Sequence, residues 1–205
     1  MKYLRIIALT LLVSTRLAGQ NWDIDITKSI NPDNPNSAFW KGMSTSASVV
    51  AVAVPATYFT LGLVKKQPEL KHKSYEMVGA IAIESLLTQG LKYSIDRMRP
   101  AEKYPDDIHP YKDLHGKSMP SGHTALAFAT ATTLSLNNSK WYVVVPAYIW
   151  AAGVGYSRMY LGVHYFSDVM VGAAVGVLSG FASHYIFHKW IYKGSTNKSS
   201  HSVGL

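Results

Sequence analysis

The sequence predicts an all-α fold, a membrane-embedded bundle of about five transmembrane helices. The clearest indication is residues 43–64, a run of 22 residues without a charged side chain. As a helix this run would be about 33 Å long, enough to cross a hydrocarbon core of about 30 Å. The second indication is that four further apolar stretches have helical length, whereas strand-like alternation is too brief to form a sheet.

The expected helices follow one another through short connections, at residues 43–64, 75–98, 121–136, 141–156 and 169–190. Between the first two lies a basic loop, which contains Lys65, Lys66, Lys71 and Lys73. In the last helix Gly172, Gly176 and Gly180 recur every four residues. Such a ridge of small residues permits close packing against another helix.

The two ends of the chain differ from the bundle. Residues 1–20 have the charged start, short apolar core and small-residue exit of an export signal. An uncleaved anchor is the alternative, because Arg16 directly precedes the expected cleavage site. One domain should then occupy residues 21–192, followed by a polar, mobile tail at 193–205. Residues 21–41 are polar and turn-rich, and we expect them to form a surface segment without a chemical role.

Composition narrows the classes of protein. The net charge is +8, but the basic residues are dispersed and form no basic helix with interleaved aromatics, so nucleic acid is not an expected partner. An anionic membrane surface or substrate explains the charge equally well. The chain has no cysteine, which excludes disulfides, thiolate metal sites and a cysteine nucleophile. Its mean hydropathy of +0.05 is modest, so a soluble periplasmic helical enzyme is the alternative architecture.

Two motifs upstream of residue 125 have the chemistry of anion binding. Lys92 and Arg99 are seven residues apart and project to one side of a helix that Pro100 is expected to end. Ser121 is a natural N-cap of the next helix, where free N–H groups favour an anion and Gly122 lets a ligand approach closely. His123, in the first turn, is placed to give or take a proton.

A third motif lies at residues 157–168. His164 and Asp168 are four residues apart, so on a helix or helix-like turn the carboxylate can accept a hydrogen bond from the imidazole. That bond would leave the second ring nitrogen available as a nucleophile. Arg158 adds a fork of donors suited to phosphate oxygens.

Lys-x6-Arg-Pro, Pro-Ser-Gly-His and Ser-Arg-x5-His-x3-Asp, in that order, resemble the three-part pattern of the type 2 phosphatidic acid phosphatase (PAP2) superfamily. Lipid phosphate phosphatases, class A acid phosphatases and vanadium haloperoxidases belong to that superfamily. All eleven specified positions are filled between residues 92 and 168. The resemblance implies the helical core that these enzymes share.

The resemblance also implies roles for individual residues. The phosphate oxygens would be held by side chains and backbone N–H groups of Lys92, Arg99, Ser121, Gly122 and Arg158. The catalytic residues would be His164, which attacks phosphorus, Asp168, which orients it, and His123, which protonates the leaving group and then activates water. No metal and no cofactor are implied.

The expected function is metal-independent hydrolysis of a phosphomonoester or pyrophosphate of a membrane lipid through a phosphohistidine. Alternatives are a soluble periplasmic acid phosphatase of broad specificity, a vanadate-dependent peroxidase and a non-catalytic protein that binds lipid headgroups. With the signal removed, five crossings put all three motifs on the exterior face and the basic loop inside, as the positive-inside rule requires.

Other polar residues have simpler interpretations. We expect Asp96 to pair with Lys92, four residues before it. Arg97 is not one of the specified positions of the Lys-x6-Arg-Pro motif. His109 with His115, and His184 with His188, have no suitably spaced third ligand in the sequence. Neither pair is therefore predicted to bind a metal.

Overall fold

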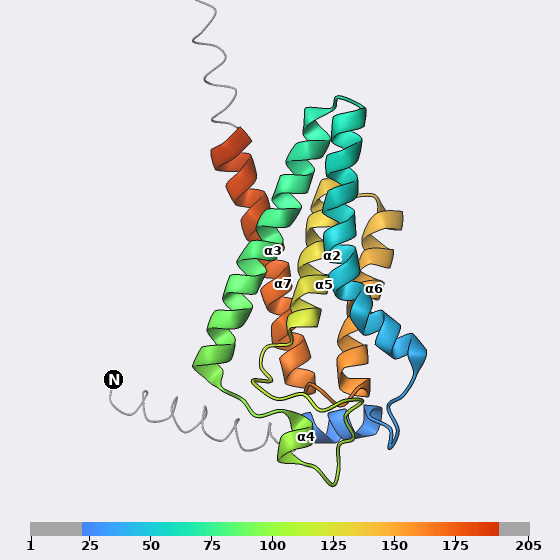
Figure 1. Ribbon diagram of the computed structural model, residues 1–205. Helices are drawn as coiled ribbons and strands as arrows, with labels where there is room; N and C mark the ends of the chain where they lie inside the picture. The colour runs from blue at the N-terminus through green and yellow to red at the C-terminus, as the bar shows by residue number, and fades with distance from the viewer. Residues whose placement is uncertain (1–21, 193–205) are drawn as a thin grey trace, which may run out of the picture.

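The computed structural model describes residues 22–192, which contain helices and no strand, so the all-α prediction is confirmed for this part of the chain. The long helices are α2 (Ala38–Val64), α3 (Pro68–Ile95), α5 (Gly122–Asn137), α6 (Trp141–Tyr160) and α7 (Phe166–Ile186). A π-helix, η1 (Phe187–Tyr192), continues α7, α4 (Pro100–Lys103) is a single turn, and residues 22–30 are helical (Figure 1). The predicted signal at 1–20 and tail at 193–205 lie outside the described residues.

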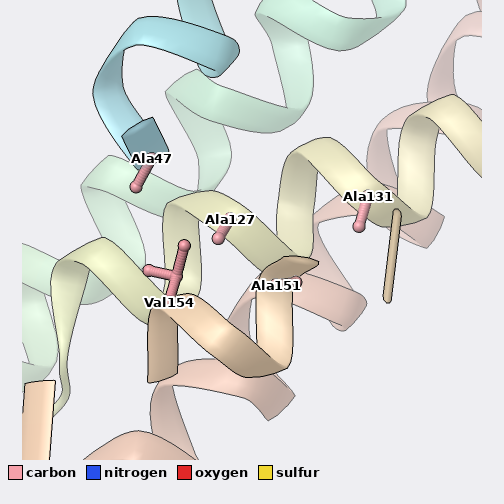
Figure 2. Packing of buried hydrophobic residues seen from close by; sticks show 5 residues of the cluster. All are labelled: Ala47, Ala127, Ala131, Ala151 and Val154. Atoms are coloured by element: carbon pink, nitrogen blue, oxygen red, sulfur yellow. The ribbon is translucent and has the colours of Figure 1, made fainter. Parts of the chain in front are cut away.

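The central helix of the bundle is α5, which packs against α2, α3, α6 and α7. Its buried side chains are all alanine or threonine. Figure 2 shows the apolar centre of the bundle, where Ala127 and Ala131 of α5 meet Ala47 of α2 and Ala151 and Val154 of α6. Side chains this small let four helices approach α5 closely, because little volume has to be accommodated between their backbones.

The glycine ridge of α7 packs directly on α5. A Cβ atom at Gly172 would lie 2.6 Å from the Ser121 carbonyl oxygen, and one at Gly176 would overlap the Ala125 carbonyl oxygen. At Gly180 the nearest atom would be Cγ2 of Thr132, at 2.7 Å. The predicted close packing is therefore confirmed, and it fixes the start of α7 beside the start of α5.

Two predicted boundaries on α3 were wrong. The helix begins at Pro68, so Lys71 and Lys73 are helical and the basic loop is only a short turn; proline is well tolerated in a first turn, where its missing N–H is not needed. The helix ends at Ile95 instead of before Pro100, because Asp96 adopts a left-handed conformation with φ of 48°. Pro100 begins α4.

The outer faces of the bundle are strongly apolar. Among the described residues α2 and the segment Phe166–Lys189 are long and apolar enough to cross a membrane, with mean hydropathies of 1.8 and 1.5. Large exposed apolar side chains also lie on α3 and α6, among them Val78, Leu86, Trp141, Val145 and Ile149. A surface of this kind is suited to lipid contact.

Residues 22–31 and α4 cover the end of the bundle where α6 and α7 meet, and we call them the end cap. Residues 22–30 and α4 lie across this end (Figure 1), and Ile24 packs there against Ile108 and Tyr165. Asn31 holds the cap to the bundle: its side chain exchanges two hydrogen bonds with the His109 backbone, at 2.7 and 2.9 Å, and donates to the Tyr160 carbonyl at 2.9 Å. Residues 22–41 are thus an ordered part of the fold.

The packing of α7 on α5 can be tested with one added methyl group. Gly176→Ala should lower the free energy of unfolding by about 1–3 kcal/mol, the usual cost of overpacking, because its Cβ would overlap backbone. Gly90→Ala on α3 is the control: nothing lies within 4 Å of its Cβ position, so alanine should be neutral or stabilise by up to about 1 kcal/mol. Unfolding of both variants in mild detergent would measure this. Equal stabilities would contradict the tight interface.

Candidate active site

The carboxylate of Asp168 lies at the centre of the polar end of the bundle, in the first turn of α7, and is fully buried. Its Oδ2 accepts hydrogen bonds from the Tyr165 amide at 2.9 Å and from the Ser118 hydroxyl. Its Oδ1 accepts from Nη1 of Arg97 at 2.7 Å. Both oxygens are thereby held in fixed positions, and the negative charge is matched by a guanidinium.

His164 contacts this carboxylate as its spacing predicts. Nδ1 of the imidazole lies 3.4 Å from Oδ2 of Asp168, and the side chain is only 3% exposed. The contact is made across a turn, since residues 161–165 connect the two helices and α7 begins at Phe166. Gly162 shapes the turn with φ of +68°, where a Cβ would collide with the His109 carbonyl. The turn leaves Nε2 as the ring nitrogen not engaged by Asp168.

Burial strongly favours the neutral form of this imidazole. Loss of solvent lowers the pKa of His164 to about 3, and the positive charges of Arg158 and Arg99 act in the same direction. The hydrogen bond and charge of Asp168 oppose this change but do not cancel it. His164 is therefore unprotonated at neutral pH, which is the form a nitrogen nucleophile requires.

Two arginines present buried N–H groups that no described residue accepts. Arg158, in the last turn of α6, donates through Nη1 to the Ser44 hydroxyl of α2, and Nη1 of Arg99 donates to the Val163 carbonyl at 2.9 Å. The Nε atom of each is buried without a hydrogen-bond partner among the described residues. A buried guanidinium with unmatched donors is suited to an oxyanion.

The remaining predicted residues surround the same place. Lys92, in the last turn of α3, interacts electrostatically with Arg99, Arg158 and Asp168. His123 in turn interacts with Lys92, Arg99 and Arg158. Three separate stretches of sequence thus bring their cations and both histidines to one end of the bundle.

The start of α5 meets the start of α7 at this point. Ser121 is the N-cap residue of α5, as predicted, and its amide donates to the Asp168 carbonyl at 3.0 Å. The Ser121 side chain does not cap the helix; its Oγ accepts from the Thr124 hydroxyl at 2.9 Å. Gly122 is the first residue of α5, so its backbone N–H and those of the next two residues have no partner within the helix.

Sequence reasoning missed an ionic network behind Asp168. Arg97 binds Asp168 through Nη1 and Asp23 through Nη2, the latter at 2.6 Å, while its guanidinium stacks 3.7 Å above the Tyr165 ring. Asp23 also accepts from the Ser167 amide at 2.7 Å. Asp23 lies in the segment to which we assigned no chemistry, and nothing in the sequence signals a pairing across more than 70 residues.

The connection between α4 and α5 covers the site. Its Ser118 binds Asp168, and its Lys117 carbonyl accepts from Lys92 at 2.8 Å. The Lys117 side chain pairs with Asp96 at 3.0 Å. The predicted pairing of Asp96 with Lys92 was therefore wrong, because the left-handed turn at Asp96 takes it off the face of α3 that carries Lys92.

An open groove leads away from the site between α2, α3 and α5. It has a volume of about 410 Å³, and Lys92, Gly122 and His123 line one end. The groove continues past Thr88 and Glu84 of α3 to apolar side chains, Ile81 of α3 and Leu126 of α5. It therefore connects a cationic end with the apolar middle of the bundle.

Comparison with known proteins finds relatives of this chain. The model of the PAP2 superfamily matches residues 74–192, more than half of the chain. A lipid A 1-phosphatase of Porphyromonas gingivalis is 41% identical over 98 residues, 46% of this chain and 19% of that protein. A lipid A 4'-phosphatase of Bacteroides thetaiotaomicron is 27% identical over 180 residues, covering 82% of this chain and 78% of that protein.

Two solved structures have the same fold. LpxE of Aquifex aeolicus superposes with a TM-score of 0.64 and 28% identity, covering 79% of this chain and 94% of that one. A transmembrane PAP2 type phosphatidylglycerolphosphate phosphatase of Bacillus subtilis superposes with a TM-score of 0.68 and 25% identity, covering 91% and 95%. The second of these is a transmembrane protein, in accord with the apolar outer surface of this bundle.

The ionic network can be tested by removing its cation. Arg97→Gln should lower the free energy of unfolding by about 3 kcal/mol, the lower end for breaking a buried pair, because the Arg97 side chain is 24% exposed. Adding Asp23→Asn should recover part of this loss, since one carboxylate is then neutral. Lys28→Gln, which breaks an exposed pair with Asp107, is the control and should cost at most about 1 kcal/mol. A small effect of Arg97→Gln would contradict the network.

The buried His164 predicts a particular response to acid. Its folded pKa of about 3 lies below its ordinary value, so below about pH 6.5 the unfolded chain binds more protons than the folded one. Stability should therefore fall as the pH drops from about 6.5 toward 3. His164→Gln removes this titration, so its unfolding temperature should rise relative to that of the parent chain between pH 7 and 4.5. If the unfolding temperatures of the two proteins change in parallel with pH, a neutral, buried His164 would be refuted.

Proposed function

The chain belongs to the PAP2 superfamily, and from this premise we propose that it is a phosphatase that removes phosphate from a membrane lipid through a phosphohistidine on His164. The observation that carries the proposal is the meeting of a buried, neutral His164 with unmatched guanidinium donors of Arg99 and Arg158. A nucleophile and an oxyanion site at one place are what phosphoryl transfer to a protein side chain needs.

Phosphate binding would use the cations that converge at the end of the bundle. Nε of Arg99 and Nε of Arg158 offer donors to the phosphate oxygens, and Lys92 adds a third positive charge. Backbone N–H groups at the start of α5, from Gly122 onward, and the Ser121 hydroxyl complete the set. We propose that no metal takes part, because these groups supply the charge stabilisation that a metal ion supplies in many other phosphoryl-transfer sites.

The chemistry would proceed in two displacements. Nε2 of His164 attacks phosphorus, the bond from phosphorus to the lipid oxygen breaks, and His123 protonates the departing oxygen. His123 then takes a proton from water, which attacks the phosphohistidine and releases inorganic phosphate. Asp168 holds the imidazole through Nδ1 and stabilises the positive charge that it acquires.

A lipid substrate is supported by the surroundings of the site. The groove from His123 runs between helices toward the apolar middle of the bundle, so a phosphate headgroup and an acyl or isoprenoid chain can be accommodated together. The outer faces of α2, α3, α6 and α7 are apolar. The compared proteins are named for lipid A and phosphatidylglycerophosphate, which makes phosphomonoesters and pyrophosphates of such lipids the proposed substrate class.

The membrane arrangement is part of the proposal. Five crossings, by α2, α3, α5, α6 and α7, would place the catalytic end at the periplasmic or exterior face. Basic residues gather at the opposite end, where α2 meets α3 and α5 meets α6, at Lys65, Lys66, Lys71, Lys73 and Lys140. The positive-inside rule would keep that end in the cytoplasm. Residues 1–20 are proposed to act as an export signal.

Phosphate release in EDTA tests the reaction. Purified chain in detergent should hydrolyse at least one of phosphatidate, phosphatidylglycerophosphate, lipid A and an isoprenoid pyrophosphate. His164→Ala should reduce the rate at least about a thousandfold, because the nucleophile is lost. His109→Ala, which removes a partly exposed imidazole outside the site, is the matched control and should retain full activity. Labelled substrate should leave acid-labile phosphate on the wild-type chain only.

Three outcomes would count against parts of this proposal. Equal rates in wild type and His164→Ala would eliminate His164 as the nucleophile. Hydrolysis of a soluble aryl phosphate with no lipid substrate would indicate an acid phosphatase of broad specificity. Absence of activity on every substrate, from protein with the parent's unfolding temperature, would refute a phosphatase.

A further inference from the structure

A second cluster of ligand-type side chains lies at the end of the bundle opposite the catalytic residues. Glu76 of α3, His184 of α7 and His188 of η1 place one ligand atom each within 4.8 Å of one another. Nδ1 of His184 is 2.9 Å from Oε1 of Glu76, and Nε2 of His188 is 3.5 Å from Oε2. Our expectation that no carboxylate accompanies the two histidines was wrong, because α3 supplies one from 108 residues earlier.

We propose that Glu76, His184 and His188 form a binding site for a divalent transition-metal ion, with zinc as the best match. Two imidazole nitrogens and one carboxylate oxygen are a common set of protein ligands for zinc. Bonds of about 2.1 Å at tetrahedral angles hold neighbouring ligand atoms about 3.4 Å apart. The observed separations of 2.9 and 3.5 Å lie on either side of that value, so small side-chain movements would suffice.

The backbone around the cluster is already fixed. The Ser183 hydroxyl donates to the Glu76 carbonyl at 2.7 Å and ties α7 to α3. Gly79, one turn after Glu76, allows this approach, since a Cβ there would lie 2.7 Å from the ring of Phe187. Asn137 donates to Oε1 of Glu76 at 3.1 Å, the kind of outer contact that orients a metal-binding carboxylate.

The two histidine rings lie in contact, tilted by 39°, at the change from α-helix to π-helix. Their ring centroids are 4.2 Å apart. His184 belongs to the last turn of α7 and His188 to η1, which begins at Phe187. Single π-helical turns inside α-helices occur often at functional sites. Across this turn one nitrogen of each imidazole is directed to the same carboxylate, Nδ1 of His184 and Nε2 of His188.

Charge provides an independent argument. The side chain of Glu76 is only 1% exposed, and a buried carboxylate requires a compensating positive charge. Lys73 lies nearby, but its ammonium group donates to the Asn137 carbonyl at 3.1 Å. A divalent cation held by the two imidazoles would balance the carboxylate.

The site is also open to solvent. A cavity of about 220 Å³ adjoins it, lined by Glu76 and His188 together with Glu69, His72 and Lys73. The His188 side chain is 56% exposed, which gives an ion a route to the carboxylate. A water molecule can enter by the same route and fill the fourth position of a tetrahedral ion. A bound ion would cross-link α3 to the end of α7, far along the bundle from the proposed nucleophile.

Zinc binding to the purified full chain would test the site. Protein without an affinity tag would be stripped with a chelator, freed of it and titrated with Zn²⁺ in competition with a chromophoric indicator. We expect about one equivalent to bind and to raise the unfolding temperature, because the ion binds the folded chain preferentially. Co²⁺ should give the visible absorption bands of a four-coordinate site.

His188→Ala is the decisive variant, because its exposed side chain can be removed with little effect on the fold. It should weaken zinc binding at least about a hundredfold, since loss of an outer-shell partner alone often costs ten- to a hundredfold. Glu76→Gln should have a similar effect while it keeps an acceptor for Asn137. His109→Ala, distant from the cluster, should bind zinc as the parent does.

The result that would overturn the proposal is equal zinc affinity in the parent chain and His188→Ala, or no stoichiometric binding by the parent. Either would mean that Glu76 and the histidines form only a hydrogen-bonded group. Phosphate release in EDTA should be the same for the parent and His188→Ala. Failure of the metal site is thus distinguishable from failure of the proposed phosphatase activity.

Discussion

The buried carboxylate of Asp168 is the interaction on which the catalytic end of this bundle depends. A carboxylate without solvent is stable only if each oxygen is hydrogen-bonded and its charge is matched. The Tyr165 amide, Ser118 and Arg97 meet these needs from three parts of the chain, and the Asp168 backbone receives the amide of Ser121. The same residue that orients His164 therefore also joins the start of α7 to the covering loop and to the start of α5.

Small side chains make this arrangement possible. The buried residues of α5 are alanine and threonine, and α7 faces them with Gly172, Gly176 and Gly180, so the two helices pack with their backbones almost in contact. Their first turns can then share one polar site. This packing also explains the modest mean hydropathy of the chain: its central helix is surrounded by other helices, so it needs little of the leucine, isoleucine and phenylalanine that lipid-facing surfaces carry.

The two ends of the bundle differ in the charged groups at their candidate sites. At the catalytic end, Lys92, Arg99 and Arg158 exceed the nearby carboxylates that could neutralise them, which leaves an excess of positive charge for a phosphate. At the other end Glu76 is a buried negative charge beside two imidazoles. A phosphate at the first end and a divalent cation at the second are the ligands that we propose for these groups. The shared α3 and α7 keep these sites apart.

The sequence by itself determined the helical class and the approximate helix positions, and it predicted the eight site residues, because helical periodicity, charge-free runs and short motifs are local properties. It also determined that His164 meets Asp168, since four residues span one turn. Only the tertiary structure decided that Arg97 joins Asp168 to Asp23 and that Glu76 joins His184 and His188. Buried charges find their partners through helix packing, and pairings across 71, 74 or 108 residues leave no periodic pattern in the chain.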